Sequence, residues 1–250
     1  MKSIVFCTSF FRNEKDWSSR NQRWLDHYRQ IPFDDSRLFM IDDGSFYTPA
    51  AEQIQCVSDT EDLRQIDAHA LIVRFGNRLG RSGAVSYPGW WRSFLHSVSI
   101  ARMLDAKKII HVESDAFILS PRLLDYIEQL QQGWTALWTA HFGMPETAIQ
   151  IICEDQYDKL EALRKRRVSE FEGVQAEDIL PFTEVNKQFI GDRYGELRVP
   201  ILSRGILRSS KFNRMKFFRR NCFRARIPAN ADFATQVSPD QKIWLPGSLR

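Results

Sequence analysis

The sequence predicts an α/β protein with a mostly parallel sheet flanked by helices, and three observations support this fold class. Short apolar runs rich in strand-forming residues alternate with segments in which apolar residues recur every three or four positions. Each of these runs stops abruptly at a cluster of turn-forming residues. The chain of 250 residues is 43% hydrophobic and 26% charged, which is enough apolar material for one well-buried core. We therefore expect one continuous domain whose two halves are residues 1–140 and 141–250.

The individual elements follow from this alternation of strand and helix patterns. In the first half, strands are expected at 2–9, 37–41, 70–75 and 108–112, and helices at 18–31, 90–106 and 123–130. Ser18 or Ser19 is available to cap the first helix, and Pro32 ends it. A further strand is expected at 135–140 and a charged helix at 154–167, while the rest of the second half mixes short apolar runs with loops.

The composition indicates reduced thiols and no membrane-spanning segment. The cysteines are far apart without the paired spacing of a zinc motif or a disulfide framework; they are Cys7, Cys56, Cys153 and Cys222. No apolar run approaches the roughly 18 residues of a membrane-spanning helix. The apolar start of the chain is too short for the core of a signal peptide. We therefore expect a cytoplasmic protein.

Charge is divided unevenly along the chain. The net charge is +4, yet residues 197–231 contain ten Lys or Arg and no Asp or Glu, whereas the rest holds 25 basic and 31 acidic residues. Within this tail, residues 204–226 interleave Phe and Met with cations, which suits peripheral contact with an anionic membrane surface. A solvated basic face is the alternative. Nucleic acid is not expected as a partner, because no recognised binding module accompanies the tail.

Polar clusters follow three of the predicted strands, at 42–45, 76–81 and 113–115. In a parallel sheet these positions share one edge, outside the carboxyl ends of the strands, where open α/β sheets bind their ligands. The third cluster, Glu-Ser-Asp, places two carboxylates on the same side of an extended chain. Such a pair suits a hard divalent cation that keeps positions open for phosphate oxygens. Taken alone, it is also consistent with a turn or a helix cap.

The motifs occur in a distinctive order along the chain: KSIVFCTSF, IDDGS, FGNRLGR, WWRSFLHSVSIARMLDA and HVESDAF. This series resembles the nucleotide-binding half of glycosyltransferases with the GT-A fold, in particular the inverting enzymes of family 2. The match covers about the first 140 residues; IDDGS is moderately specific, the acidic triplet is weak alone, and the ordered set is stronger. The resemblance implies a GT-A-like sheet, with a nucleotide sugar bound by the first half and an acceptor by the second.

The resemblance also implies roles for individual residues in nucleotide binding. The matched positions lie at or just after strand ends; they are Thr8, Arg12, Asp42, Asp43, Arg78, Arg81 and Ser114. Asp42 or Asp43 would accept a hydrogen bond from the base of the donor, most often a uracil ring N–H. Arg78 and Arg81 would meet the diphosphate, unless they are only solvated surface residues.

A divalent metal, Mn²⁺ or Mg²⁺, is the cofactor that the resemblance implies. Asp115 would be its principal ligand, and Glu113 would reach it directly or through water. The chain departs from the family in having Glu at the first position and in lacking a late histidine, since His141 is the last one. A water, a carboxylate such as Asp192 or Asp232, or a metal-independent mechanism would have to serve instead.

An inverting enzyme also needs a carboxylate that takes the proton from the acceptor hydroxyl. In the family this base lies downstream of the metal motif in a pair of acids, which here matches Glu177 and Asp178. Asp178 is favoured over its neighbour, with Glu184 and Asp192 as further candidates. An ordinary acid in the first turn of a helix is the alternative interpretation.

The sequence therefore predicts metal-assisted transfer of a sugar to a glycan or lipid-linked acceptor of a surface polysaccharide such as lipopolysaccharide or capsule. A UDP-sugar is the favoured donor, and inversion is the favoured outcome. A sugar-1-phosphate nucleotidyltransferase is one alternative, but it would want a glycine-rich loop after the first strand, and residues 8–13 contain no glycine. A non-catalytic module that binds polyanions or membranes through its tail is the other. That module would make the acidic clusters dispensable.

Overall fold

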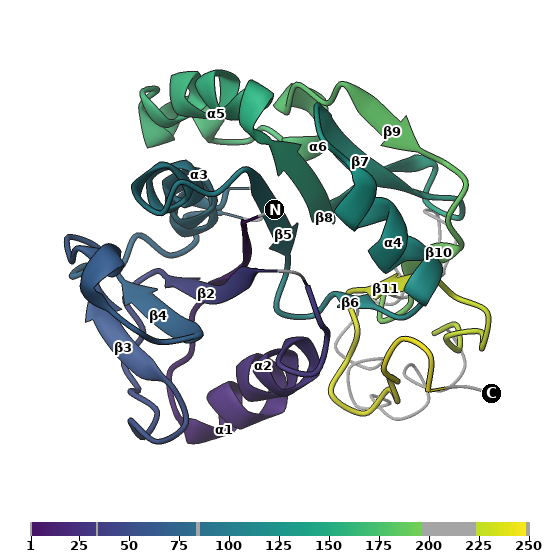
Figure 1. Cartoon of the computed structure of the whole chain (residues 1–250), viewed down its shortest axis with the longest axis horizontal. Coiled ribbons are helices and arrows are strands. Elements are labelled where there is room, and N and C mark those ends of the chain that lie inside the picture. The colour runs from purple at the N-terminus through teal and green to yellow at the C-terminus, as the bar shows by residue number, and fades with distance from the viewer. Residues whose placement is uncertain (1, 34, 84–85, 197–223, 249–250) are drawn as a thin grey trace.

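The computed structural model describes residues 2–33, 35–83, 86–196 and 224–248, and within them eight strands form one sheet (Figure 1). The order across the sheet is β3-β4-β2-β1-β5-β8-β7-β9. The strand bounds are β1 Ser3–Ser9, β2 Ser36–Asp42, β3 Gln55–Ser58, β4 Ala70–Arg74, β5 Lys108–Val112, β7 Trp134–Thr139, β8 Met144–Cys153 and β9 Glu184–Asn186. Strands β3, β4, β2, β1 and β5 are parallel, and β8 runs antiparallel to both of its neighbours. The predicted fold class, a mostly parallel sheet with flanking helices, is confirmed.

Strand β1 lies at the point where the strand order reverses. The chain first builds outward from β1 through β2 to β4, and then crosses over to place β5 on the other side of β1. A crevice opens at such a switch point, outside the carboxyl ends of the strands. The register aligns Ser9 with Asp42 and Phe6 with His111, which brings Thr8 opposite Glu113. The polar clusters predicted at the strand ends therefore meet at one edge.

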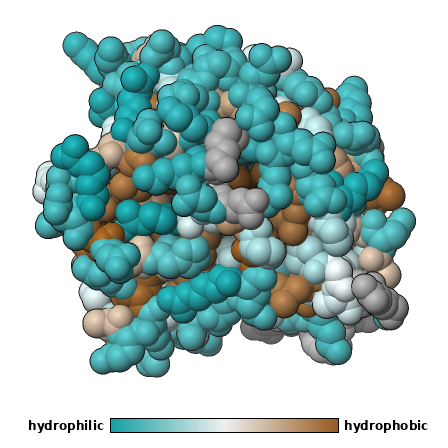
Figure 2. All heavy atoms as spheres, in the orientation of Figure 1, coloured by the Kyte–Doolittle hydropathy of each residue, from teal (hydrophilic) through white to brown (hydrophobic). Residues whose placement is uncertain are grey.

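Helices cover both faces of the sheet (Figure 1). Their bounds are α1 Glu14–Asp16, η1 Trp17–Gln22, α2 Arg23–Tyr28, η2 Leu63–Gln65, α3 Pro88–Met103, α4 Pro121–Gln129, η3 Glu154–Gln156, α5 Tyr157–Arg164, η4 Val168–Phe171 and α6 Ala176–Ile179. Because side chains alternate along a strand, β1 contributes to both cores. Val5 and Cys7 join the core under α2 and α4, whereas Ile4 and Phe6 join the core under α3 and α5. The face seen in Figure 2 is mostly hydrophilic, as expected where the apolar sides of the helices are turned inward.

The first helical segment starts earlier than the sequence predicts. Its cap is Asn13, whose side chain accepts a hydrogen bond of 2.9 Å from the Asp16 amide, and not Ser18 or Ser19. The middle of the segment, η1, is a π-helix, a wide turn that is rare and often found at functional sites. Trp24 fastens the segment to the sheet through its indole N–H, which donates to the Val112 carbonyl at 3.0 Å. The segment therefore lies directly against the end of β5.

Several strands of the structure were not predicted from the sequence. Strand β8 occupies an interior position of the sheet. A smaller sheet of three strands, in the order β10-β11-β6, contains β6 Phe117–Ile118, β10 Gly191–Arg193 and β11 Phe233–Thr235. This sheet lies beside the loop that follows β5 and completes the surroundings of the acidic triplet.

The predicted membrane-contacting segment, 204–226, lies outside the described residues except for its last three positions. Cys222 also falls outside them, while the described cysteines, Cys7, Cys56 and Cys153, are free thiols. Among the helices of the described ranges, none is both long enough and apolar enough to cross a bilayer.

Candidate active site

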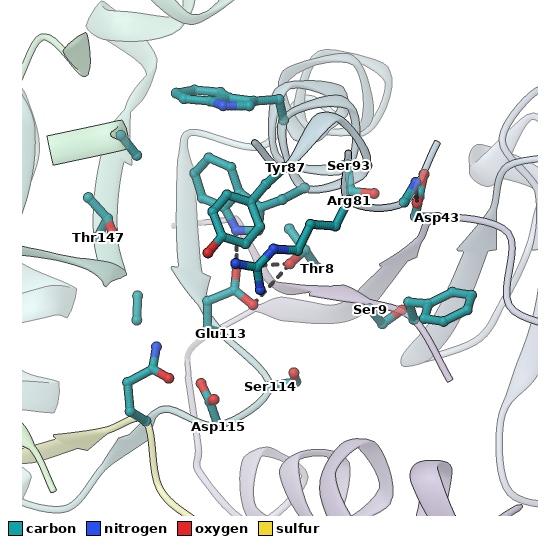
Figure 3. A pocket seen from close by; sticks show the side chains of 18 of the residues that line it. Thr8, Ser9, Asp43, Arg81, Tyr87, Ser93, Glu113, Ser114, Asp115 and Thr147 are labelled. Atoms are coloured by element: carbon teal, nitrogen blue, oxygen red, sulfur yellow. Dashed lines mark hydrogen bonds between the residues drawn. The ribbon is translucent and has the colours of Figure 1, made fainter. Parts of the chain in front are cut away.

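A cavity of about 690 Å³ opens at the carboxyl ends of β1, β2 and β5 (Figure 3). Most of the residues singled out from the sequence line it: Thr8, Asp43, Arg78, Arg81, Glu113, Ser114, Asp115 and Glu177. The other three lie elsewhere. Asp42 is fully buried beside the cavity, Arg12 lines a neighbouring cavity, and Asp178 is exposed outside both.

Glu113 is held by donors from three directions. The Thr8 hydroxyl donates to both of its carboxylate oxygens, at 2.8 and 2.9 Å. His111 Nε2 lies 3.0 Å from Oε1, and the indole N–H of Trp90 donates to the same oxygen. Burial opposes ionisation, but the hydrogen bonds from His111 and Trp90 and the positive charge of Arg20 outweigh it, so the pKa of Glu113 lies below its ordinary value. Glu113 is therefore a fixed negative charge at the back of the cavity.

Asp115, two residues along, is in a different state. Its Oδ2 forms an ion pair of 2.9 Å with Arg20 from η1. Its Oδ1 is buried and has no hydrogen-bond partner anywhere in the described chain. Burial raises the pKa of Asp115 above its ordinary value, against the attraction of Arg20. A buried carboxylate oxygen without a partner is costly unless something supplies one.

The acidic pair supplies some, but not all, of the ligands that a divalent cation requires. Figure 3 shows Glu113 and Asp115 bordering the same open space. Among the described residues, no group of three or more His, Cys, Asp or Glu gathers with the geometry of a metal site. The Oδ1 of Asp115 suits one coordination position, and within the described ranges Glu113 Oε2 accepts a hydrogen bond only from Thr8. A cation here would depend on water and ligand oxygens for the rest of its shell.

Asp42 holds the loop after β2 in place. Its carboxylate accepts from Arg74 Nε at 2.7 Å, from the Ser45 amide at 3.0 Å and from the Ser9 hydroxyl at 3.2 Å. The side chain has no exposed surface. This placement gives Asp42 a structural role and leaves contact with a bound base to other residues.

Asp43 joins this loop to the next one. It accepts from the backbone N–H groups of Leu79 at 3.2 Å and Gly80 at 2.7 Å, and it forms an ion pair with Arg92. A Cβ atom at Gly89 would lie only 2.1 Å from the Asp43 carboxylate, which explains why helix α3 has glycine here. Asp43 faces the cavity but also fixes the loop that carries Arg78 and Arg81.

Arg78 and Arg81 are held by aromatic rings. The Arg78 guanidinium lies 4.0 Å from the centre of the Phe10 ring, and it makes no hydrogen bond or ion pair with the part of the chain that the structure describes. Arg81 lies 4.5 Å from the centre of the Tyr87 ring and donates to the Gly83 carbonyl. Stacking on an aromatic ring fixes the position of a guanidinium group without neutralising its charge. The Arg78 guanidinium can therefore meet an anion in the cavity.

The far wall of the cavity contains a buried ionic cluster. Arg193 from β10 pairs with Glu146 at 2.9 Å and with Glu177 at 2.8 Å. Burial raises the pKa of Glu146, against the attraction of Arg193. Glu177 also accepts from the Thr147 hydroxyl at 3.1 Å. Of the predicted acid pair, Glu177 faces the cavity and Asp178 faces solvent.

The other carboxylates considered from the sequence are occupied elsewhere. Glu184 accepts from Tyr126, and Asp192 accepts from the backbone amides of Arg193 and His141. Asp232 is buried outside the cavity, where Arg122, Ser120 and a backbone amide hold it. Neither Asp192 nor Asp232 lines the cavity to complete a metal shell.

Several cavity residues were not found from the sequence. Arg20 lies on the π-helical turn, where the 3.6-residue pattern gives no signal. Glu146 and Arg193 lie on β8 and β10, which were not predicted, so nothing placed them near the acidic triplet. Only their residue type could have indicated a role in the site, since a charged residue within an apolar segment is often paired or functional.

Comparison with protein-family models and with curated proteins gives no match. Among solved structures, a galactosyltransferase, LgtC, in complex with donor and acceptor sugar analogs is similar over 93% of this chain and 86% of that chain, with a TM-score of 0.49 and 13% identity. A structure of an active-site mutant of LgtC gives a TM-score of 0.46 and 10% identity over 93% of this chain and 86% of that chain. A glycosyltransferase involved in glycosylation of the major capsid of PBCV-1 gives 0.44 and 9% over 94% of each chain. Likeness at these scores does not establish function, which has to be inferred from the site.

Proposed function

We propose that this protein is a glycosyltransferase that binds a nucleotide sugar, a UDP-sugar, in the cavity at the carboxyl ends of β1, β2 and β5. The observation that carries the proposal is the pair of Glu113 and Asp115, each with only 13% of its side chain exposed, in the same cavity as Arg78 and Arg81. One oxygen of Asp115 has no hydrogen-bond partner among the described residues. A diphosphate needs positive charge around it, and these arginines supply part of it. Thr8, Asp43 and Ser114 complete the proposed nucleotide site.

A divalent cation, Mn²⁺ or Mg²⁺, would be held by Asp115 through its open oxygen and by Glu113 directly or through water. When bound, such a cation stabilises the negative charge that develops on a departing nucleoside diphosphate. The fixed charge of Glu113 adds electrostatic attraction for it. Arg20, already paired with Asp115, limits the excess of negative charge in the absence of ligand.

The proposed reaction is a displacement at the anomeric carbon of the donor sugar. The acceptor hydroxyl oxygen forms a bond to this carbon, while the bond from the carbon to the diphosphate oxygen breaks and the diphosphate leaves with the electron pair. The hydroxyl proton passes to a carboxylate, for which Glu177 is placed on the cavity wall. A single displacement of this kind inverts the anomeric configuration, which proton NMR of the product would test.

Substituting Glu177→Gln tests its role as the base. Because the amide cannot take the proton, kcat is expected to fall by about 100-fold or more, in the range typical of a lost general base. UDP affinity should stay within a few fold, because the cavity keeps its shape and its other charges. Steady-state kinetics and UDP titration measure the two quantities separately. An unchanged kcat would exclude this assignment.

The acceptor proposed is a glycan or lipid-linked intermediate of a surface polysaccharide. The uneven charge of the chain supports it, because the basic tail of residues 197–231 suits an anionic surface on which such acceptors lie. Vesicle co-sedimentation with anionic and neutral lipids would test this, and equal binding to both would argue against it.

Thermal unfolding in the presence of nucleotides tests the proposed function. A specific ligand present at about 100 times its Kd raises the free energy of unfolding by about 2.7 kcal/mol. UDP with Mn²⁺ is expected to stabilise the wild type, and Asp115→Asn should abolish most of this effect. Asp158→Asn is a matched control, because Asp158 is exposed on α5 and far from the cavity.

The outcomes separate the proposal from its alternatives. Stabilisation by a nucleoside triphosphate with a sugar phosphate, and not by UDP, would favour a nucleotidyltransferase. Stabilisation by polyanions alone, with Asp115→Asn behaving as the wild type, would favour a non-catalytic module.

A further inference from the structure

A second cavity of about 900 Å³ adjoins the first. Its walls come from the π-helical turn, from the start of α2, from the loop after β5 and from residues 236–239 after β11. Seven residues line both cavities, and they are Phe10, Arg20, Arg78, Arg81, Ser114, Asp115 and Gln236. A molecule in each cavity would therefore meet its neighbour at the acidic triplet.

The two cavities differ in charge. The first is lined by five carboxylates and four arginines: Asp43, Glu113, Asp115, Glu146 and Glu177 against Arg20, Arg78, Arg81 and Arg193. The second is lined by six arginines and three carboxylates: Arg12, Arg20, Arg23, Arg78, Arg81 and Arg224 against Asp16, Asp115 and Glu196. An excess of positive charge in a concave site attracts anions. Without the residues that line both cavities, the first keeps one arginine against four carboxylates, and the second keeps three arginines against two carboxylates. The second cavity is thus the better place for an anionic group.

Two buried donors in this cavity lack acceptors. Asn21 is 2% exposed, and its side-chain Nδ2 has no hydrogen-bond partner among the residues that the structure describes. Nε of Arg224 also has no partner within the described ranges, whereas its Nη1 donates to the Ser238 hydroxyl at 3.0 Å and lies 3.7 Å from Asp240 Oδ1. Buried donors are nearly always paired in folded proteins. Both residues line this cavity, and an anionic oxygen that reached either atom would supply the missing acceptor.

Other arginines build the wall of this cavity. Arg23 donates to the carbonyls of Ser238 at 3.0 Å and Gln241 at 2.6 Å, which ties α2 to the chain after β11. Arg12 pairs with Asp16 at 3.0 Å in an exposed position. The donors without acceptors are therefore set in a wall that is fixed by its own hydrogen bonds, while Arg12 remains accessible at the rim.

We infer that the second cavity binds the acceptor and recognises a phosphate group on it. This inference rests on the proposed function, in which the first cavity holds the donor. A phosphate presents its oxygens in several directions, so donors from separate elements, such as Asn21 and Arg224, can reach it together. A planar carboxylate instead matches the fork of one guanidinium. The acceptor hydroxyl would then lie near the boundary at Asp115, where the anomeric carbon of the donor must also lie.

Calorimetric titration in the presence of saturating UDP and Mn²⁺ tests the inference, because the donor site is then filled. Glucose 6-phosphate is expected to bind, whereas glucose and glucuronate should bind at least about tenfold more weakly, the difference that a set of charge-assisted hydrogen bonds provides. Binding should also weaken as ionic strength rises. A short prenyl phosphate in detergent serves as a second probe and separates a lipid-borne phosphate from one carried by a sugar.

Two variants remove the unpartnered donors of Asn21 and Arg224 while leaving a side chain of similar shape in the wall of the second cavity. Asn21→Leu keeps the branched shape and the number of heavy atoms of the side chain, and Arg224→Gln keeps the stem and a polar end. Each is expected to weaken glucose 6-phosphate binding by about tenfold or more. Asn21→Leu should not lower the midpoint of thermal unfolding, since the amide nitrogen that it removes has no hydrogen-bond partner among the described residues. Arg102→Gln is the matched control, because Arg102 is a paired surface arginine on α3.

Three results would overturn the inference. The first is absence of phosphate-dependent binding in a protein that binds UDP. The second is binding that neither variant weakens. The third is binding that UDP displaces, which would make the second cavity part of the donor site. A protein that fails to bind UDP would instead contradict the proposed function, so the two failures can be told apart.

Discussion

Glu113 and Asp115 show how two carboxylates separated by a single residue acquire opposite properties. Thr8, His111 and Trp90 surround Glu113 with donors and stabilise its charge. Asp115 forms one ion pair, and its Oδ1 has no hydrogen-bond partner among the described residues. Burial opposes its ionisation. The difference comes from their surroundings, since both are ordinary acids in the unfolded chain.

This difference predicts opposite pH dependences of stability. The pKa of Glu113 is depressed in the folded state, so its contribution is present above the ordinary value of 4.5 and is lost as pH falls through the lower folded pKa. The pKa of Asp115 is raised, so its ionisation reduces stability as pH rises from 3.8 to the higher folded pKa. Relative to Glu113→Gln, the wild type should gain stability with rising pH. Relative to Asp115→Asn, it should lose stability.

Urea unfolding in metal-free buffer, at several values between about pH 3 and 7, measures both trends. The same sign of pH dependence for the two variants would show that the described environments of these carboxylates are wrong.

At the scale of elements, loops after parallel strands are joined to one another through side chains. Asp43 after β2 holds the backbone of the loop after β4 and packs against Gly89 at the start of α3. The Gly89 amide also donates to the Gly80 carbonyl of that loop at 2.9 Å. The π-helical turn holds Arg20 against Asp115 in the same manner. The ends of several elements therefore fix each other, which gives cavity residues a rigid setting.

Gly89→Ala is expected to disturb this junction. The added Cβ would lie 2.1 Å from the Asp43 carboxylate, so the carboxylate or the helix must move. Such overpacking costs about 1–3 kcal/mol in the free energy of unfolding. It should also weaken UDP binding, because the loop that carries Arg78 shifts. Urea unfolding and UDP titration measure these effects.

Gly76→Ala is the matched control in the loop that follows β4. A Cβ at Gly76 would meet nothing within 4 Å, so its effect on both quantities should be small. Equal effects of the two substitutions would argue against the packing described for Asp43.

For the molecule as a whole, the part of the sheet that could be predicted from the sequence is the part built from strands with uninterrupted apolar sequences. Strands β1, β2, β4 and β5 are short apolar runs with clear ends, and those ends locate the acidic triplet and the Asp43 loop. Strand β8 was missed because polar residues such as Glu146 interrupt it, and β3 is a short edge strand with little burial. The spacing of hydrophobic residues therefore does not reveal such strands.

Contacts between distant segments explain what else the sequence could not show. Arg193 links Glu146 and Glu177, and Arg20 reaches Asp115, across separations that no local pattern spans. The motif predicted that Asp42 contacts the ligand. Its burial and its hydrogen bonds to Arg74, Ser45 and Ser9 show instead that it holds a loop. The acidic triplet could be predicted because strand end and carboxylates are adjacent in sequence.

In the proposed function, Glu113 and Asp115 bind a divalent cation together with a diphosphate. Electron paramagnetic resonance of Mn²⁺ tests it directly, because the sharp signal of the free ion disappears on binding. The described chain offers the cation few ligands, so tight binding should require UDP as well as protein, beyond the amount that UDP alone removes. Asp115→Asn should weaken this ternary binding by at least about tenfold, the usual cost of losing a charged contact. Mn²⁺ binding that is the same in wild type and Asp115→Asn, or that does not respond to UDP, would contradict the claim.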